Sequence, residues 1–314
     1  MSDDTGGIAR RVTEEIPASL DGVRIDRVVS LIADISRSAA SALIAAGGVT
    51  VDGQVVVAGK EKMTQGQTIT VDIAQATGPA LPEADASRVL DVVYSDDDVI
   101  VVNKEAGIVV HPGAGNQAGT MVNYLLAAYP EIAHVGEAMR PGLVHRLDAG
   151  TTGLVAVART PAAYDSLVEQ LSSRSVTRVY SAVVWGAPVS AHGVIDAPIG
   201  RDQRDPTRMA VVVDGRPSRT HYVVERQYHV PKECALVECR LETGRTHQIR
   251  VHLASIGHSV VGDPTYSGVR PGLRVSRPML HARKLAFDHP RSGKRHTFTA
   301  PMPADIAGLL ATLS

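Results

Sequence analysis

Several features that define common protein classes are scarce or missing in this sequence of 314 residues. It has only two cysteines, Cys234 and Cys239, which are too few for a disulfide framework. They lie five positions apart on an expected strand, so their side chains point to opposite faces. No apolar run approaches the roughly 18 residues that a membrane-spanning helix needs, and residues 1–20 lack the apolar core of a secretory signal. We therefore expect a cytoplasmic protein with no membrane contact.

Sequence motifs for metals, nucleotides and serine nucleophiles are also missing. There is no Gly-x-x-x-x-Gly-Lys or Gly-x-Gly-x-x-Gly loop to hold phosphates, and no His-Glu-x-x-His or paired Cys-x-x-Cys to bind a metal. There is no Gly-x-Ser-x-Gly turn to present a serine. The sequence therefore predicts a protein that works without a metal or another cofactor.

The net charge of −1 is the balance of three unequal segments. Residues 1–90 have 8 Lys and Arg against 12 Asp and Glu, residues 91–139 have 1 against 7, and residues 140–314 have 23 against 14. The cations of the last segment are nearly all arginine, which binds phosphate with two parallel hydrogen bonds and stacks on bases. This composition is typical of an RNA-binding face, although a solvated arginine-rich surface explains the charge equally well.

The first quarter of the chain predicts a small α+β domain. Apolar residues with helical spacing begin at Ile25, and a second helix is expected between Ser36 and Gly47. Valines alternate around the turn Asp52-Gly53, which indicates a β-hairpin. The predicted divisions of the chain are a disordered tail at 1–17, the small domain at 18–75, a linker at 76–88 and a large domain at 89–314.

The segment RIDRVVSLIADISRSAASALIAAGGVTVDGQVV, which begins at Arg24, resembles the small RNA-binding domain named after ribosomal protein S4. The resemblance implies that two helices place cations against an RNA backbone, and the candidates are Arg24, Arg27 and Arg37. Because this copy is net acidic, the alternative is a docking module that does not bind RNA strongly by itself.

Strands dominate the large domain. Successive strands are expected at 176–185, 209–213, 220–225 and 235–241 without a helix between them. This order favours a largely antiparallel α+β sheet with flanking helices over a doubly wound one. A further strand is expected at Ile108–Val110, and one of the helices is expected to have Thr246 as its N-cap and to carry Arg250.

A single aspartate stands on a glycine-rich loop in the stretch LVHRLDAGTTGLVAVART, residues 143–160. Gly150 and Gly153 allow positive φ and the close approach of a ligand, and Arg146 would suit an anionic substrate. Taken alone, Asp148 is more simply explained as the cap of a turn. The assignment therefore depends on the other motifs of the chain.

Four separated motifs resemble those of the RluA/RluD-type RNA pseudouridine synthases, large-subunit ribosomal RNA branch. They are LVHRLDAGTTGL, RVYSAVVWG, LETGRTHQIRVHLASIGHSVVGDPTY and LHARKLAFDHPRSG, and they occur in the family's order. The resemblance runs from about Val89 to Pro303 and implies the α+β pseudouridine synthase fold and an isomerase that converts uridine to pseudouridine. That reaction is redox-neutral and consumes no external reactant, so it needs no cofactor. The family often has Lys-Asp after its catalytic aspartate, whereas Ala149-Gly150 follow here, which concerns target choice more than activity.

The resemblance also implies the roles of three catalytic residues. Asp148 would act at the anomeric carbon of the sugar, either as nucleophile or as base. Arg250 would pair with Asp148, and a nearby guanidinium lowers a carboxyl pKa by about 1–3 units. Tyr180 would stack on the uracil and could help to remove the proton from its carbon five.

RNA contacts are expected from three further residues. Arg146 would contact the flipped-out nucleotide or fill its vacated place, and Asn103 and Lys104 would touch phosphate. The expected partner is ribosomal RNA or an assembling large ribosomal subunit, and the expected state is a monomer. Two alternatives are the same chemistry on transfer RNA or another ribosomal site, and a catalytically silent RNA-binding ribosome-assembly factor. A silent factor has no need of Asp148, Tyr180 and Arg250 together, so an enzyme is favoured.

Overall fold

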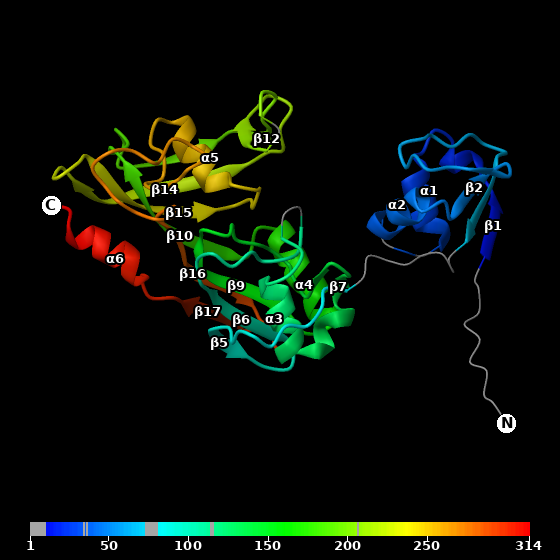
Figure 1. The fold of residues 1–314 in the computed structure, drawn as a ribbon, viewed down its shortest axis with the longest axis horizontal. Coiled ribbons are helices and arrows are strands. Elements are labelled where there is room, and N and C mark those ends of the chain that lie inside the picture. Colours follow the sequence, from blue (N-terminus) through cyan, green and yellow to red (C-terminus); the bar gives the residue numbers. More distant parts are fainter. Residues whose placement is uncertain (1–10, 34, 36, 73–80, 114–115, 206) are drawn as a thin grey trace. The chain divides into compact units, whose positions relative to one another are not determined.

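A computed structural model describes residues 11–33, 35, 37–72, 81–113, 116–205 and 207–314 of the chain. The described residues divide into two compact units, one from the chain up to Leu81 and one from most of the chain beyond it (Figure 1). The predicted helix cap at Ser36 and residues 76–80 of the predicted linker lie outside the described residues. None of the described helices is both long and apolar enough to cross a membrane.

The small unit packs two helices on an antiparallel sheet with the strand order β1-β4-β2-β3. Its elements are β1 (Arg11–Glu15), α1 (Ile25–Ala33), α2 (Arg37–Ala45), β2 (Val49–Val51), β3 (Gln54–Val55) and β4 (Thr68–Asp72). The predicted apolar stripe is buried, with Ile25, Val28 and Val29 all 0% exposed. The predicted hairpin is also present, since Asp52 and Gly53 have φ of 50° and 79° between β2 and β3.

The structure corrects the expectation of a disordered tail at 1–17 for its described part. Arg11–Glu15 pairs with Thr68–Asp72 along its whole length, and Ile16 is 1% exposed in the core of the small unit. The prediction failed because β1 is an edge strand and its side chains are mostly exposed. Such a strand lacks the apolar alternation by which a strand is identified in a sequence.

Among the described residues of the large unit, nine strands form one mixed sheet with the order β11-β14-β15-β10-β16-β9-β6-β5 and with β17 beside β16. These strands are β5 (Val92–Ser95), β6 (Val99–Lys104), β9 (Thr152–Ala158), β10 (Thr177–Trp185), β11 (His192–Asp196), β14 (Arg219–Tyr228), β15 (Cys234–Leu241), β16 (Leu280–Asp288) and β17 (Arg295–Thr299). Short strand pairs lie outside this sheet: β7 (Gly136–Glu137) with β8 (Arg140–Pro141), and β12 (Ile199–Arg201) with β13 (Met209–Val211). Neighbouring strands of the sheet run antiparallel except β9 and β16, which are parallel. The predicted largely antiparallel α+β fold is confirmed.

Helices cover both faces of this sheet. They are α3 (Met121–Ala128), α4 (Pro161–Ser172), α5 (Gln248–Ser255) and α6 (Ala304–Ala311). Neighbouring residues of β6 point to opposite faces of the sheet. Val102 packs in a hydrophobic cluster with side chains of α3 and α5, whereas Val101 packs in another cluster with side chains of α4. On β10, Val184 lies in the first cluster, whereas Val183 packs with α6. This alternation places α3 and α5 on one face of the sheet and α4 and α6 on the other.

Two local predictions in the large unit are wrong. Ile108–Val110 is no strand, because the carbonyl groups of Val109 and Val110 accept hydrogen bonds from Met121 N and Val122 N at the start of α3. The cap of α5 is His247 rather than Thr246, and His247 has the left-handed φ of 58°.

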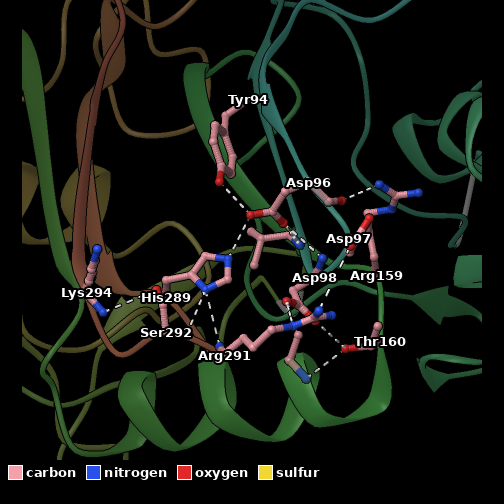
Figure 2. Close-up of polar contacts among 12 residues, drawn as sticks. Tyr94, Asp96, Asp97, Asp98, Arg159, Thr160, His289, Arg291, Ser292 and Lys294 are labelled. Atoms are coloured by element: carbon pink, nitrogen blue, oxygen red, sulfur yellow. Dashed lines mark hydrogen bonds and ion pairs between the residues drawn. The ribbon is translucent and has the colours of Figure 1, made fainter.

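A polar network joins the β5–β6 turn to the β16–β17 turn (Figure 2). The carboxylate of Asp96 accepts hydrogen bonds from the Tyr94 hydroxyl at 2.5 Å and binds His289 Nε2 at 2.8 Å. Burial alone would raise the pKa of Asp96, but these bonds and the backbone N–H groups of Asp98 and Val99 lower it to about 2. Asp96, Asp98 and His289 offer ligand atoms within 4.8 Å of one another, as metal ligands do, but each already binds protein groups in this network.

Candidate active site

Asp148 lies on the loop that leads into β9, and the backbone of this loop is held at three consecutive residues. Thr151 N donates to the carbonyl of Asp148 at 3.0 Å. The carbonyl of Ala149 accepts from Gly107 N at 2.9 Å, and the carbonyl of Gly150 accepts from Arg277 Nη1 at 3.1 Å. The carboxylate is therefore carried by a backbone with fixed geometry, while its side chain remains 17% exposed.

Arg250 on α5 binds this carboxylate, as the sequence predicted. Its Nη1 donates to Asp148 Oδ2 at 3.0 Å across a separation of 102 residues. Its Nε and Nη2 donate to the two oxygens of Asp263 at 2.6 and 2.9 Å, and Asp263 is 0% exposed. Burial alone would lower the pKa of Arg250, but the hydrogen bonds and charges of Asp263 and Asp148 outweigh it and raise the pKa. The guanidinium is therefore a permanent cation that one carboxylate anchors and presents to the other.

His247 and Tyr266 complete the surroundings of Asp148. His247 Nε2 lies 3.9 Å from Asp148 Oδ1, and His247 Nδ1 is hydrogen-bonded to the Tyr266 hydroxyl at 2.9 Å. The Tyr266 ring lies against the Arg250 guanidinium, with 5.1 Å from its centroid to Cζ. Burial lowers the pKa of His247 against the opposing effect of Asp148. Both residues and Asp263 lie in one of the four motifs, but they were not predicted as site residues because nothing in their spacing relates them to Asp148.

Tyr180 on β10 is 6% exposed and lines the same cavity as Asp148. Burial raises the pKa of its hydroxyl to about 12, with the charge of Asp148 acting in the same direction and that of Arg178 against it. The ring therefore presents a neutral aromatic surface to whatever enters beside the carboxylate.

The cavity above Asp148 has a volume of about 620 Å³, which lies within the usual range for small-ligand pockets. The described lining is rich in guanidinium groups, contributed by Arg140, Arg146, Arg174, Arg178, Arg245 and Arg250. Arg146 is exposed, and no side-chain hydrogen bond or ion pair ties it to any described residue. The volume suits a nucleotide-sized group, and the charge suits a polyanion.

Comparison with known proteins decides the family. The sequence model described as RNA pseudouridylate synthase matches residues 98–255, which include Asp148, Tyr180 and Arg250. The RNA pseudouridine synthase YlyB of Bacillus subtilis, described as uncharacterized, is 44% identical over 92% of this chain and 94% of its own length. The chain belongs to the RNA pseudouridine synthase family. Members of this family are isomerases.

Other relatives agree with membership of the RNA pseudouridine synthase family. Ribosomal large subunit pseudouridine synthase D of Nitrosomonas europaea is 42% identical over 95% of this chain and 86% of its own length. The solved structure of human RNA pseudouridylate synthase domain containing 1 superimposes with a TM-score of 0.57 and 28% identity, and it covers 74% of this chain and 91% of that one. A second sequence model, the S4 domain, matches residues 23–66. The predicted RNA-binding domain at the start of this synthase is thereby confirmed as an S4 domain.

The structure corrects the expectation that Lys104 touches phosphate. The side chain is 1% exposed, and its Nζ donates to the carbonyl groups of Glu105, Ile108 and Ala149 at 2.8, 2.9 and 3.1 Å. Burial lowers the pKa of Lys104 to about 7, against the opposing effect of Asp148. Lys104 therefore supports the loop of Asp148 from inside the synthase and cannot reach an RNA backbone.

The positive φ expected at the two loop glycines is present at Gly153 but not at Gly150. Gly153 has φ of 113°, and a Cβ there would lie 2.3 Å from the carbonyl oxygen of Ala282 on the parallel neighbour β16. A Cβ at Gly150 would lie 2.9 Å from Pro278 Cδ. Both glycines thus permit close packing within the synthase rather than the approach of a ligand.

The remaining predicted RNA contacts stay predictions. Asn103 is half-buried, and its amide nitrogen donates to Asp91 at 2.8 Å. In the S4 domain, Arg27 is exposed and Arg24 forms an ion pair with Asp26 at 2.7 Å. The side chain of Arg37 lies outside the part that the structure describes.

Proposed function

We propose that this synthase isomerises uridines in large-subunit ribosomal RNA, with Asp148 as the reacting carboxylate. The observation that carries the proposal is the Asp263–Arg250–Asp148 arrangement, in which Arg250 and Asp148 line an arginine-rich cavity. The target class is supported by relatives of nearly full length whose names give the ribosomal large subunit. The proposed location is the cytoplasm, and the proposed active form is a monomer.

The proposed chemistry needs a carboxylate at the anomeric carbon of an extruded uridine. A stacked nucleotide hides that carbon, so the uridine must leave the stack before the reaction, which costs a few kcal/mol. Arg146 is exposed at the cavity, in a position to contact the extruded nucleotide or the RNA that it leaves. Asp148 then attacks C1′ or removes a proton from C2′, and Arg250 keeps the carboxylate oriented.

Tyr180 is proposed to stack on the uracil while the ring turns. Its buried position in the cavity wall suits stacking. A hydroxyl with a pKa of about 12 is protonated at neutral pH, so it is a poor base in the free protein. Removal of the proton from carbon five is therefore the less favoured of the two roles considered for Tyr180.

The test replaces Asp148 and separates chemistry from binding. Asp148→Asn is expected to abolish pseudouridine formation and to leave RNA affinity nearly unchanged, because the arginines that line the cavity remain. Pseudouridine is mapped in total RNA from cells that lack the protein and carry either the wild type or the variant. Pseudouridine formation by the variant would exclude this mechanism. Modified sites found only in transfer RNA would show that the substrate is transfer RNA and not ribosomal RNA. Unchanged pseudouridine in cells that lack the protein would favour a silent RNA-binding factor.

A further inference from the structure

Arg178 on β10 is a buried cation without a carboxylate partner. Three arginines of the described chain, Arg178, Arg250 and Arg277, are less than 9% exposed. Arg250 and Arg277 each bind both oxygens of one carboxylate. Within the described residues, Arg178 forms no ion pair: its Nη2 donates to the carbonyl of Glu242 at 3.1 Å, and its buried Nε has no hydrogen-bond partner. A buried charge is normally paired, so this exception indicates a partner that is not part of the protein.

The position of Arg178 relates this cation to the proposed uracil site. Arg178 precedes Tyr180 by two residues on the strand, so both side chains lie on the same face, and both line the cavity. The charge reaches its neighbours: burial and Arg178 together lower the pKa of His145 to about 3. Arg178 therefore acts electrostatically on the side of the cavity where Tyr180 lies.

Gly244 leaves one edge of this guanidinium uncovered. A Cβ at Gly244 would lie 2.5 Å from Arg178 Nη1, so a larger residue would collide with the group or displace it. Gly244 also lines the cavity, and the same segment supplies the Glu242 carbonyl that holds Nη2. The guanidinium is thus held at one nitrogen and left open at another.

The charge balance of the proposed reaction gives this cation a task. When the bond between C1′ and N1 breaks, its electron pair stays with the uracil, which becomes an anion. Asp148 loses its charge in the same step, either by bonding to C1′ or by taking the proton of C2′. Carbon five of the ring then bonds to C1′ and loses its proton to a base, and N1 gains a proton, so nothing is consumed. One negative charge therefore moves temporarily from Asp148, where Arg250 lies, to the ring.

We propose that Arg178 is a further catalytic residue, which binds a carbonyl oxygen of the departing uracil and stabilises the negative charge of the ring. The inference rests on the proposed function. An ion pair with a carboxylate of the protein would already neutralise the guanidinium, whereas an unpaired one interacts most strongly when the charge develops on the ring. Groups that are oriented in advance toward a developing charge stabilise the transition state more than the ground state.

The first experiment compares Arg178→Gln and Arg178→Lys with the wild type in single-turnover assays on a ribosomal RNA fragment. Loss of one such stabilising group typically costs about 100-fold in rate, so we expect a drop of about that size for Arg178→Gln with RNA affinity nearly unchanged. Arg178→Lys retains the charge and is expected to recover part of the rate. Gly244→Ala keeps the arginine but introduces a Cβ that would collide with its Nη1, and it is expected to slow the reaction as well.

A matched control is Arg240→Gln, which removes an exposed arginine from the neighbouring strand β15. Arg240 pairs with Val179, so its side chain lies on the opposite face of the sheet from Arg178. Its replacement is expected to leave the rate unchanged. Thermal unfolding of every variant shows whether a slow rate reflects a loss of folded protein.

The second experiment uses RNA with 5-fluorouridine at the target site. Fluorine withdraws electrons and stabilises the departing ring by itself, so the loss caused by Arg178→Gln is expected to shrink on this substrate when C1′–N1 cleavage is followed. Equal losses on both substrates, or weaker RNA binding at an unchanged rate, would place the guanidinium on a phosphate and overturn the proposal. A wild type without pseudouridine formation would instead refute the proposed function, which distinguishes the two failures.

Discussion

Replacement of Asp263 by asparagine tests whether Arg250 is anchored by the buried carboxylate of Asp263 or by the partly exposed carboxylate of Asp148. Asp263 accepts from Nε and Nη2 of Arg250 at 2.6 and 2.9 Å, and also from Thr265 N at 2.9 Å. Asp263→Asn removes the negative charge and turns one acceptor into a donor that faces the guanidinium. Because Asp263 is fully buried, water cannot replace what is lost.

The expected cost follows from burial. Breaking a buried ion pair by removing one partner costs about 3–5 kcal/mol, and we expect about 3 kcal/mol because Asp148 still binds Arg250. For a unit of this size, that corresponds to a fall of roughly 6–12 °C in Tm. The pair of Arg277 and Asp305 has the same two-bond geometry at 2.6 and 2.7 Å, but the side chain of Asp305 is 44% exposed. Asp305→Asn is therefore a control that should cost only about 1 kcal/mol.

The assay is thermal and urea unfolding of the wild type, Asp263→Asn, Asp305→Asn and Asp148→Asn. We expect Asp263→Asn to be much the least stable of the four. Asp148→Asn should stay near the wild type in stability although we expect it to be inactive, because its side chain has the weaker and more exposed contact. Equal losses for Asp263→Asn and Asp305→Asn would refute the argument from burial, and a larger loss for Asp148→Asn would reverse the two roles.

Three further predictions concern other parts of the chain. Because the pKa of His145 is lowered to about 3, the unfolded chain binds more protons than the folded one below about pH 6.5, and stability decreases as the pH is lowered, by up to about 1.4 kcal/mol per pH unit. His145→Gln should lessen this pH dependence in urea unfolding at pH 7 and pH 5, and an equal pH dependence in the variant and the wild type would contradict the reasoning. Lys104→Met leaves three carbonyl groups without a donor and should cost about 3 kcal/mol or more, with faster amide hydrogen exchange at Gly107 and Thr151; unchanged exchange would show that the loop does not depend on the lysine. Residues 82–314 alone should fold, as judged by circular dichroism, because the hydrophobic core of the small unit is separate from theirs. This fragment should act on a short RNA but bind ribosomal RNA more weakly than the full chain, and its failure to fold would count against two independent units.

The parts of the fold that were predictable from the sequence are those where burial leaves a regular pattern. The stripe that begins at Ile25 and the alternation around Asp52-Gly53 both correspond to buried faces, so their elements were found. The edge strands β1, β5 and β11 are largely exposed and leave no such pattern, so they were missed. Ile108–Val110 has the composition of a strand, but its carbonyl groups serve the start of α3, which only the tertiary structure reveals.

The site was predictable only as far as motif resemblance reached. Asp148 and Arg250 are 102 residues apart, and no spacing rule relates them, although the structure brings them to 3.0 Å. Lysine side chains usually lie on the surface, whereas Lys104 is buried because three carbonyl groups that converge in space accept hydrogen bonds from its Nζ. The proposed role of Arg178 rests on the lack of a carboxylate partner among the described residues, which the sequence alone cannot show.

The fixed backbone around Asp148 has a consequence for the choice of RNA. A loop tied at three successive residues by Lys104, Gly107, Arg277 and its own turn cannot travel far to meet a buried base. The deformation must then come almost wholly from the nucleic acid, which pays a few kcal/mol to expel a nucleotide from a regular helix and less at a bulge or loop. A rigid catalyst of this kind would discriminate among uridines by how readily each one can be displaced, so the local deformability of the transcript would contribute to target selection.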